Sequence, residues 1–345
     1  MFLSPLDVLL SGFLAGGQPR EEVRKDAEKG DAQQQTILAF GYGWGLSNVE
    51  ESARWYRKAA DQNYAPAQFH LGWMYDNTYY VGVPGALGQD YVEAARWYRK
   101  AADQGYAPAQ FNLGVMFDSG EGVVQDYSEA VKFYRRAADQ GLDKAQFNLG
   151  LKYDKGQGVG QDYVEAARWY RKAADQGLSR AQFNLGLKYT RGQGVSQDYA
   201  QAYMWINIAA PHANDADGKR YAAIRDRIAE KMKPTQIAEA QRLAATWYRK
   251  AADQGSFIAQ SKLGLVYESG EGVAQDYVQA HIWMSLAASQ ASHSPNYAEM
   301  RDRVAAKMNP AQLAEAQRLA REWRPTEEKT ERNARPSPNR TSPRE

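Results

Sequence analysis

The stretch QDYVEAARWYRKAADQG occurs at residues 89–105 and again, letter for letter, at residues 161–177. Its first three letters, Q-D-Y, recur every 36 residues, at Gln89, Gln125, Gln161 and Gln197, and return at Gln275. A fixed period of this length is typical of a repeat protein, in which each period forms one supersecondary unit. The repeated segment is therefore interpreted as a building block and not as a duplicated active site. Six units begin near residues 31, 64, 106, 142, 178 and 256.

The first half of each unit has the pattern of a short helix. In the unit that begins near residue 106, Pro108 suits a first helical turn and Gly120 suits a helix C-terminus. Between them, Ala109, Leu113 and Phe117 recur every four residues and form one apolar stripe. This spacing predicts a helix of about a dozen residues that buries one face.

The second half of the unit predicts another helix. Asp126, followed by Glu129 three residues later, predicts an N-cap of the capping-box type. Apolar residues then follow at i, i+3, i+4, i+7 and i+8: Ala130, Phe133, Tyr134, Ala137 and Ala138. Small residues, among them Gly114 on the first helix, predict that the two helices approach closely. One such hairpin leaves apolar surface uncovered, so it must stack on neighbouring units.

The combined pattern is A-x-x-x-L-G-x-x-Y/F-x-x-G-x-G-V followed by D-x-x-x-A-x-x-W/F-Y-x-x-A-A-x-x-G. It fits residues 109–123 and 126–141, and its copies cover most of residues 31–323. The pattern resembles the Sel-one-like repeat family, a relative of the tetratricopeptide repeat. The resemblance implies an all-α fold, a right-handed α-solenoid superhelix of antiparallel helix pairs, here with six repeats plus two extra capping helix pairs. It also implies an adaptor that holds other proteins together, and some bacterial relatives act in the envelope or against host cells.

The regular period is interrupted twice. After Trp205 and after Trp283, residues 221–244 and 297–320 carry two similar sequences that predict an extra helix pair, broken at Pro234 and at Pro310. The first of these copies runs without a break into another WYRKAADQG. One helix from Pro234 onward is therefore expected to serve both as a cap and as part of the next repeat.

These interruptions divide the chain into five expected segments. They are an N-terminal segment (1–20), repeats one to five (21–210), an inserted helix pair with a bridging helix (211–245), the sixth repeat with C-terminal capping helices (246–324) and a disordered tail (325–345). Segment 1–20 is mildly apolar but lacks Lys or Arg before Arg20, so it is interpreted as a cap, with a weak export signal as the alternative. The tail is rich in charge and proline and has no apolar periodicity.

Composition excludes several classes of function. Lys+Arg 43 against Asp+Glu 41 gives a net charge of +2, which is too balanced for a nucleic-acid-binding surface. The chain has no cysteine, and its four histidines lack the spacing of metal ligands. The GEGV and GQGV loops lack the Lys-Ser/Thr of a phosphate-binding loop, and turn glycines explain them better. The sequence therefore predicts no catalytic residue, no metal ligand and no cofactor.

The aromatic residues fall into two groups. Six tryptophans share one position of the second helix with Phe133 and are predicted to lie in the core: Trp55, Trp97, Trp169, Trp205, Trp247 and Trp283. A second apolar face of the first helix, flanked by amides, lies opposite the Leu113/Phe117 stripe and is the candidate binding face: Phe69, Trp73, Phe111, Asn112, Val115, Phe147, Asn148, Leu151, Phe183, Asn184 and Leu187. In tetratricopeptide relatives the matching residues line a concave peptide-binding surface. Packing between neighbouring repeats is the competing interpretation, and the sequence leaves both open.

The sequence thus predicts a monomeric, non-catalytic scaffold that binds a protein or peptide through the concave face of the solenoid. It predicts no nucleic-acid partner and no membrane span. The alternative is an exported envelope or secreted factor that binds peptidoglycan, another glycan or a host protein. The chain is expected to be soluble, with the cytoplasm favoured over the periplasm or the exterior.

Overall fold

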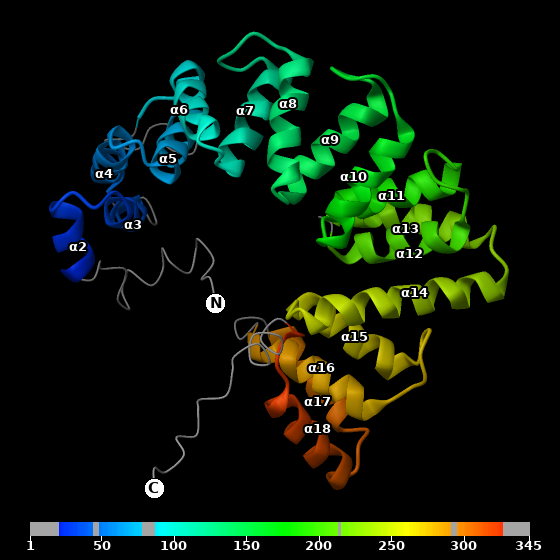
Figure 1. The fold of residues 1–345 in the computed structure, drawn as a ribbon. Coiled ribbons are helices and arrows are strands. Elements are labelled where there is room, and N and C mark those ends of the chain that lie inside the picture. The colour runs from blue at the N-terminus through cyan, green and yellow to red at the C-terminus, as the bar shows by residue number, and fades with distance from the viewer. Residues whose placement is uncertain (1–20, 44–47, 78–86, 213–214, 291–294, 327–345) are drawn as a thin grey trace, which may run out of the picture. The chain divides into compact units, whose positions relative to one another are not determined.

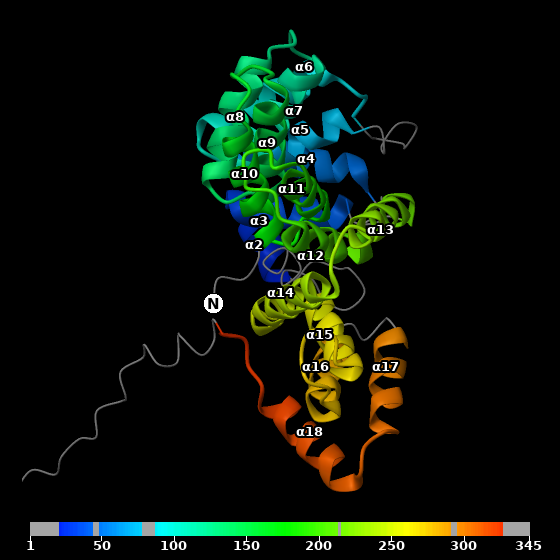
Figure 2. The same cartoon turned by 90° about the vertical axis from the view of Figure 1, so that its right-hand side faces the viewer.

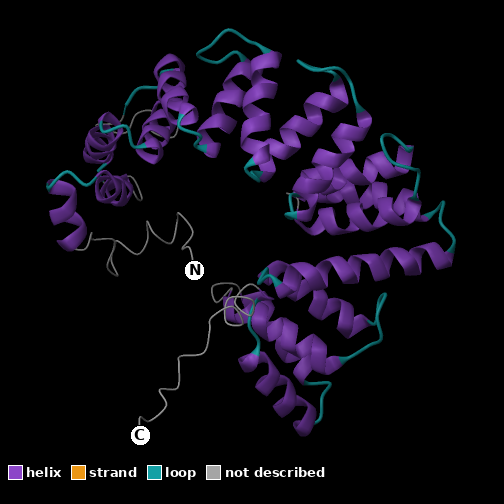
Figure 3. Ribbon diagram, viewed as in Figure 1, coloured by secondary structure: helices purple, strands orange, loops and turns teal. Residues whose placement is uncertain are grey.

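The structure is a computed structural model that describes residues 21–43, 48–77, 87–212, 215–290 and 295–326. Within these ranges the regular secondary structure is helical, and no strand occurs (Figure 3). The chain forms two compact units, residues 1–181 with 193–195 and residues 182–192 with 196–345. Segment 1–20 and residues 327–345, for which a cap or export signal and a disordered tail are predicted, lie outside the described residues.

The first unit is built from successive helix pairs (Figure 1). Its helices are α2 (Glu21–Glu28), α3 (Ala32–Gly43), α4 (Val49–Asp61), α5 (Ala65–Asp76), α6 (Tyr91–Asp103), α7 (Ala107–Ser119), α8 (Tyr127–Asp139), α9 (Asp143–Lys155) and α10 (Tyr163–Asp175). Each first helix packs against the second helix of its own pair and against the second helix of the preceding pair. The predicted all-α fold of repeated helix pairs is confirmed.

The second unit departs from this regular pairing (Figure 2). It contains α11 (Ser179–Arg191, which begins in the first unit), α12 (Tyr199–Ala209), the short 3-10 helix η3 (Ala210–His212), α13 (Asp215–Ala229), α14 (Pro234–Asp253), α15 (Phe257–Ser269), α16 (Tyr277–Gln290), α17 (Pro295–Ala305) and α18 (Pro310–Glu322). The extra helices α13 and α14 both pack against α12, and α14 also packs against α15. Proline begins α14 and α18, and α14 runs without a break as predicted.

The N-caps of the second helices make only one of the two hydrogen-bond contacts of the predicted capping box, the one from the cap side chain to the backbone. The Asp126 carboxylate accepts from the backbone N–H of Ser128 at 2.8 Å and of Glu129 at 3.1 Å. The Glu129 side chain instead accepts from Lys132 at 2.6 Å, and the Asp126 N–H donates to the Phe117 carbonyl at 2.9 Å. The reciprocal bond is missing because the cap residue's N–H already ties the second helix to the first.

Glycine explains the close approach of the two helices in a pair. A Cβ added to Gly114 on α7 would lie 2.8 Å from Cδ1 of Tyr134 on α8, which is closer than real Cβ contacts. Phe117 and Phe133 stack beside this contact with their ring centroids 5.8 Å apart. The predicted close packing across the pair is therefore present, and any larger side chain at residue 114 would force the helices apart.

A second glycine joins neighbouring repeats. Gly158, in the loop between α9 and α10, has φ +72°, and an added Cβ would lie 2.2 Å from the carbonyl oxygen of Tyr127 at the start of α8. The loop thus contacts the backbone of the preceding repeat directly. This packing supports the interpretation of the GQGV loop as a turn between the two helices of one repeat, whose glycine contacts the preceding repeat.

Buried glutamines form a polar link between repeats that was not predicted from the sequence. The Gln110 amide on α7 donates to the Ala102 carbonyl on α6 at 3.1 Å, and its oxygen accepts from Gln140 at the end of α8 at 2.8 Å. Gln146 is 5% exposed and makes the same two bonds one repeat later, to Ala138 and from Gln176. Each buried amide is therefore satisfied on both sides, and it ties three helices of two repeats together.

Candidate functional site

The candidate binding face is partly buried in the first unit. Phe69, Phe111 and Phe147 lie on α5, α7 and α9, and each packs against the tyrosine of the second helix in its own repeat, with ring centroids 5.7 to 5.9 Å apart. Trp73, Val115 and Leu151, one helical turn further along, are also half-buried. Six apolar side chains on three successive first helices thus keep part of their surface exposed.

The fourth member of the face is covered. Phe183 on α11 is 4% exposed, and its ring stacks on Tyr221 of α13 at a centroid distance of 3.9 Å. Leu187 packs in the same apolar cluster, and Asn184 is half-buried beside them. The inserted helix α13 therefore takes up the apolar surface at this repeat, and the exposed part of the face is confined to the three helices of the first unit.

The asparagines of the face serve the contact between repeats. The Asn112 amide hydrogen-bonds the Tyr98 hydroxyl, which itself donates to the Asp76 carboxylate at 3.0 Å. Burial is the main cause of the raised pKa of Tyr98 and the Asp76 charge adds to it, whereas the bond from Asn112 acts in the opposite direction. Asn148 makes the equivalent bond one repeat later. The amides are thus at least partly occupied by the protein itself.

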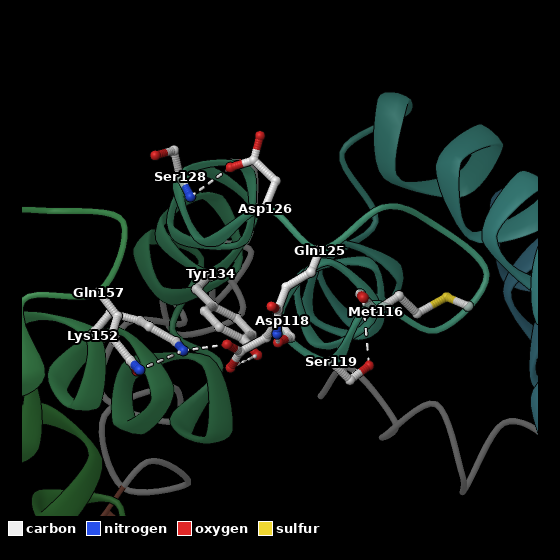
Figure 4. A network of polar contacts seen from close by, with 9 residues as sticks. All are labelled: Met116, Asp118, Ser119, Gln125, Asp126, Ser128, Tyr134, Lys152 and Gln157. Carbon is white, nitrogen blue, oxygen red and sulfur yellow. Dashed lines mark hydrogen bonds and ion pairs between the residues drawn. The ribbon is translucent and has the colours of Figure 1, made fainter.

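A buried ion pair reinforces this link in one repeat. In Figure 4 the Asp118 carboxylate on α7 faces both Tyr134 on α8 and Lys152 on α9. The Lys152 ammonium pairs with Asp118, lies 4.6 Å from the Tyr127 ring centroid and is 3.3 Å from the Gln157 side-chain oxygen. Lys152 is 5% exposed, so its charge is compensated by neighbours and not by water. The cluster joins two repeats and has no free group for a substrate.

The outer repeats carry basic residues at the position of Asn112. His70 on α5 stacks on Tyr56 with centroids 5.1 Å apart, and burial lowers the pKa of His70 to about 4. Lys262 takes the same position on α15, and burial lowers its pKa as well. The His70 ring replaces a hydrogen bond by aromatic packing, so it keeps the contact between repeats without an amide.

Six tryptophans share one position of the second helices. Five of them are 8% exposed or less: Trp55, Trp97, Trp169, Trp205 and Trp283. Trp247 is half-buried and packs edge-on against Trp205, with centroids 6.5 Å apart. The predicted core position thus holds for five of the six, which offer no stacking surface for a sugar ring, and Trp247 keeps part of its surface exposed.

The described residues contain neither a metal-binding cluster nor a membrane-spanning helix. No group of three or more His, Asp or Glu side chains in the described ranges is arranged to hold a metal ion. None of the helices that the structure describes combines the length and the apolar character needed to cross a membrane.

Comparison with known families identifies the repeat. The family model for the Sel1 repeat matches residues 35–64, 65–106, 107–142, 143–178, 179–210, 239–256 and 258–292. The chain belongs to the Sel1 repeat family. Six of these matches correspond to the six units counted from the sequence, and the seventh, 239–256, is a half-repeat formed by the second part of α14.

Solved Sel1 repeat structures are similar over most of the chain. A Sel1 repeat protein from Oxalobacter formigenes is 26% identical, with a TM-score of 0.50, over 81% of this chain and 96% of that one. A protective antigen of uropathogenic Escherichia coli that displays an SLR fold is 26% identical, with a TM-score of 0.44, over 94% and 99%. A putative Sel1 repeat protein from Klebsiella pneumoniae is 21% identical, with a TM-score of 0.40, over 61% and 100%. No curated protein matches the chain. The Sel1 fold is a helical scaffold that commonly serves protein interaction.

Proposed function

We propose that this protein is a non-catalytic scaffold that binds an extended peptide or a helix of a partner protein along α5, α7 and α9. The observation that carries the proposal is the row of six half-buried apolar side chains at matching positions of successive first helices: Phe69, Trp73, Phe111, Val115, Phe147 and Leu151. A regular apolar row that neighbouring repeats cover only in part is suited to a partner with matching periodic side chains.

The polar environment of this row favours binding over catalysis. Several titratable groups beside this row are paired: Asp76 and Tyr98 are hydrogen-bonded to each other, and Asp118 is held by Tyr134 and Lys152. Groups that are already paired in this way stabilise the contact between repeats and are not available as acids or bases. Turnover of a substrate by the pure protein, abolished by one substitution, would overturn the non-catalytic assignment.

The test compares glutamate substitutions within the candidate binding face with the same substitution outside it. Full-length protein and the variants Val115→Glu and Leu151→Glu are used as baits in cell extract, with bound proteins identified by mass spectrometry. Val124→Glu is the matched control because Val124 is 88% exposed and lies in a loop outside the face. We expect a partner that is retained by the control and lost with both face variants, all at unchanged circular dichroism. Loss of helix in the face variants would assign the row to packing between repeats.

A further inference from the structure

Tyr248 on α14 lies in a sequence, WYRKAADQG, that is identical to the one around Tyr98 on α6. The Tyr98 hydroxyl donates to Asp76, on the first helix of its own repeat, and accepts from Asn112, on the first helix of the next. Tyr248 has neither partner. The half-repeat in α14 lacks a first helix, and at the position of Asn112 α15 has Lys262.

Tyr248, which is buried, and Lys262, which is half-buried, are therefore left over. Among the residues that the structure describes, no side chain or carbonyl hydrogen-bonds the Tyr248 hydroxyl, and no carboxylate pairs with the Lys262 ammonium. Tyr248 is only 4% exposed, and burial alone raises its pKa, just as burial alone lowers the pKa of Lys262. A buried donor or charge without a partner is costly, so a ligand that supplies the partner gains that free energy.

The two groups line one pocket. It has a volume of about 460 Å³ and is also lined by Asn207 on α12, Glu268 on α15 and Lys307 in the turn after α17. Glu268 accepts from Arg303 at 2.6 Å and from Lys307 at 2.9 Å. Burial tends to raise the pKa of Glu268, but these two bonds outweigh it and the pKa falls below its ordinary value. Glu268 and Lys307 thus compensate each other's charge, whereas no described carboxylate compensates the charge of Lys262.

We propose that this pocket binds a carboxylate, supplied by an aspartate or glutamate side chain of a peptide ligand. The carboxylate accepts from the Tyr248 hydroxyl and from the Lys262 ammonium, and so takes the part that Asp76 plays for Tyr98. A doubly charged phosphate is disfavoured because Glu268 and the exposed Glu271 line the same pocket. The site lies in the second compact unit and does not depend on the proposed function of the apolar row.

The test is a calorimetric titration of the full chain, with NMR of ¹³C-labelled lysine side chains of the wild type beside it. The probes are N-acetyl-aspartate N-methylamide and its uncharged analogue, N-acetyl-asparagine N-methylamide. We expect a saturable shift of the Lys262 resonance with the aspartate probe and at least tenfold weaker binding of the asparagine probe. Equal affinity for the two probes, no saturable binding, or tighter binding of inorganic phosphate would overturn the proposal.

Variants locate the site. We expect Tyr248→Phe and Lys262→Met each to weaken binding of the aspartate probe by about tenfold or more, because each removes one bond to a charged group. Tyr134→Phe is the matched control, since the Tyr134 hydroxyl is already bonded to Asp118. Lys262→Asn introduces the residue that the other repeats use here, which keeps the test valid if Lys262→Met fails to fold. If both the Tyr248 and the Lys262 variants bind the aspartate probe as tightly as the wild type, the probe binds elsewhere and the proposal is wrong.

Discussion

The regular repeats of α5 to α10 and the half-repeat in α14 use nearly the same second-helix sequence in two different surroundings. In the regular repeats, each second-helix tyrosine meets an aspartate of its own repeat, as Tyr98 meets Asp76 and Tyr134 meets Asp118. In the half-repeat the first helix is absent, and Tyr248 and Lys262 keep unused hydrogen-bonding capacity. The comparison teaches that the second-helix tyrosine finds its hydrogen-bond partners only in a complete pair, and that the incomplete pair leaves Tyr248 and Lys262 for a ligand.

The largest expected effect concerns a contact that both regions share. Gly158 in the first unit and Gly272 in the second have φ +72° and +76°, and an added Cβ would lie 2.2 Å and 2.5 Å from backbone atoms of the preceding repeat. We expect Gly158→Ala and Gly272→Ala each to lower the free energy of unfolding by about 3 kcal/mol or more, measured by urea denaturation.

The control for these variants is Gly160→Ala. Gly160 has no atom within 4 Å of an added Cβ and no positive φ, so its loss should stay within about 0.5 kcal/mol. A large loss at Gly272 with none at Gly158 would show that the loops join repeats differently in the two regions.

The buried glutamines give the next largest effect. Gln146 in the first unit and Gln260 in the second both donate to an alanine carbonyl of the preceding second helix and accept from a later glutamine. Replacing either by alanine removes two hydrogen bonds at a buried position, so we expect a loss of about 2 kcal/mol at each site in urea denaturation. Gln161→Ala, at an exposed position, should cost about 0.5 kcal/mol, and a similar loss at all three sites would contradict the special role of the buried pair.

The two basic replacements of Asn112 differ in their response to pH. The pKa of His70 is about 4 in the folded protein, below the ordinary 6.5, so the unfolded chain binds more protons between these values. The stability contributed by neutral His70 is present above pH 6.5 and is lost as the pH falls to about 4, with a slope of at most about 1.4 kcal/mol per pH unit. We expect His70→Asn to flatten this part of the curve of unfolding free energy against pH.

Parallel curves of unfolding free energy against pH for the wild type and His70→Asn would contradict the lowered pKa of His70. The same experiment with Lys262→Asn should leave this acidic range unchanged, because lysine ordinarily titrates at about pH 10, far above it.

The helix pairs were predictable from the sequence because their signals are local. The spacing of Ala109, Leu113 and Phe117 and the cap at Asp126 are repeated so often that chance is excluded. The glutamine link carries the same period, as A-Q in the first helix and D-Q after the second, and could have been found by asking why a polar residue recurs on a buried face. The absence of the reciprocal capping-box bond could not be predicted from the sequence. The Asp126 N–H that would make it donates to a carbonyl of the first helix instead.

The candidate site was harder to predict. Helical periodicity places Phe111 and Phe183 on the same face, but it does not show that Tyr221 on α13 covers Phe183. The sequence marks Lys262 as a departure from asparagine, yet the pocket depends on a helix that is missing from the half-repeat. Such features arise from contacts between segments that are distant in the chain. A single sequence does not show which distant segments lie side by side.

The most direct test of the central claim, that a complete repeat bonds the hydroxyl of its second-helix tyrosine and the half-repeat does not, is a pair of matched hydroxyl deletions. Tyr134→Phe removes a hydroxyl that donates to Asp118, and Tyr248→Phe removes one without a described partner. In urea denaturation without ligand, we predict a loss of about 1 kcal/mol for Tyr134→Phe and no loss, or a small gain, for Tyr248→Phe. An equal loss in both variants would contradict the account.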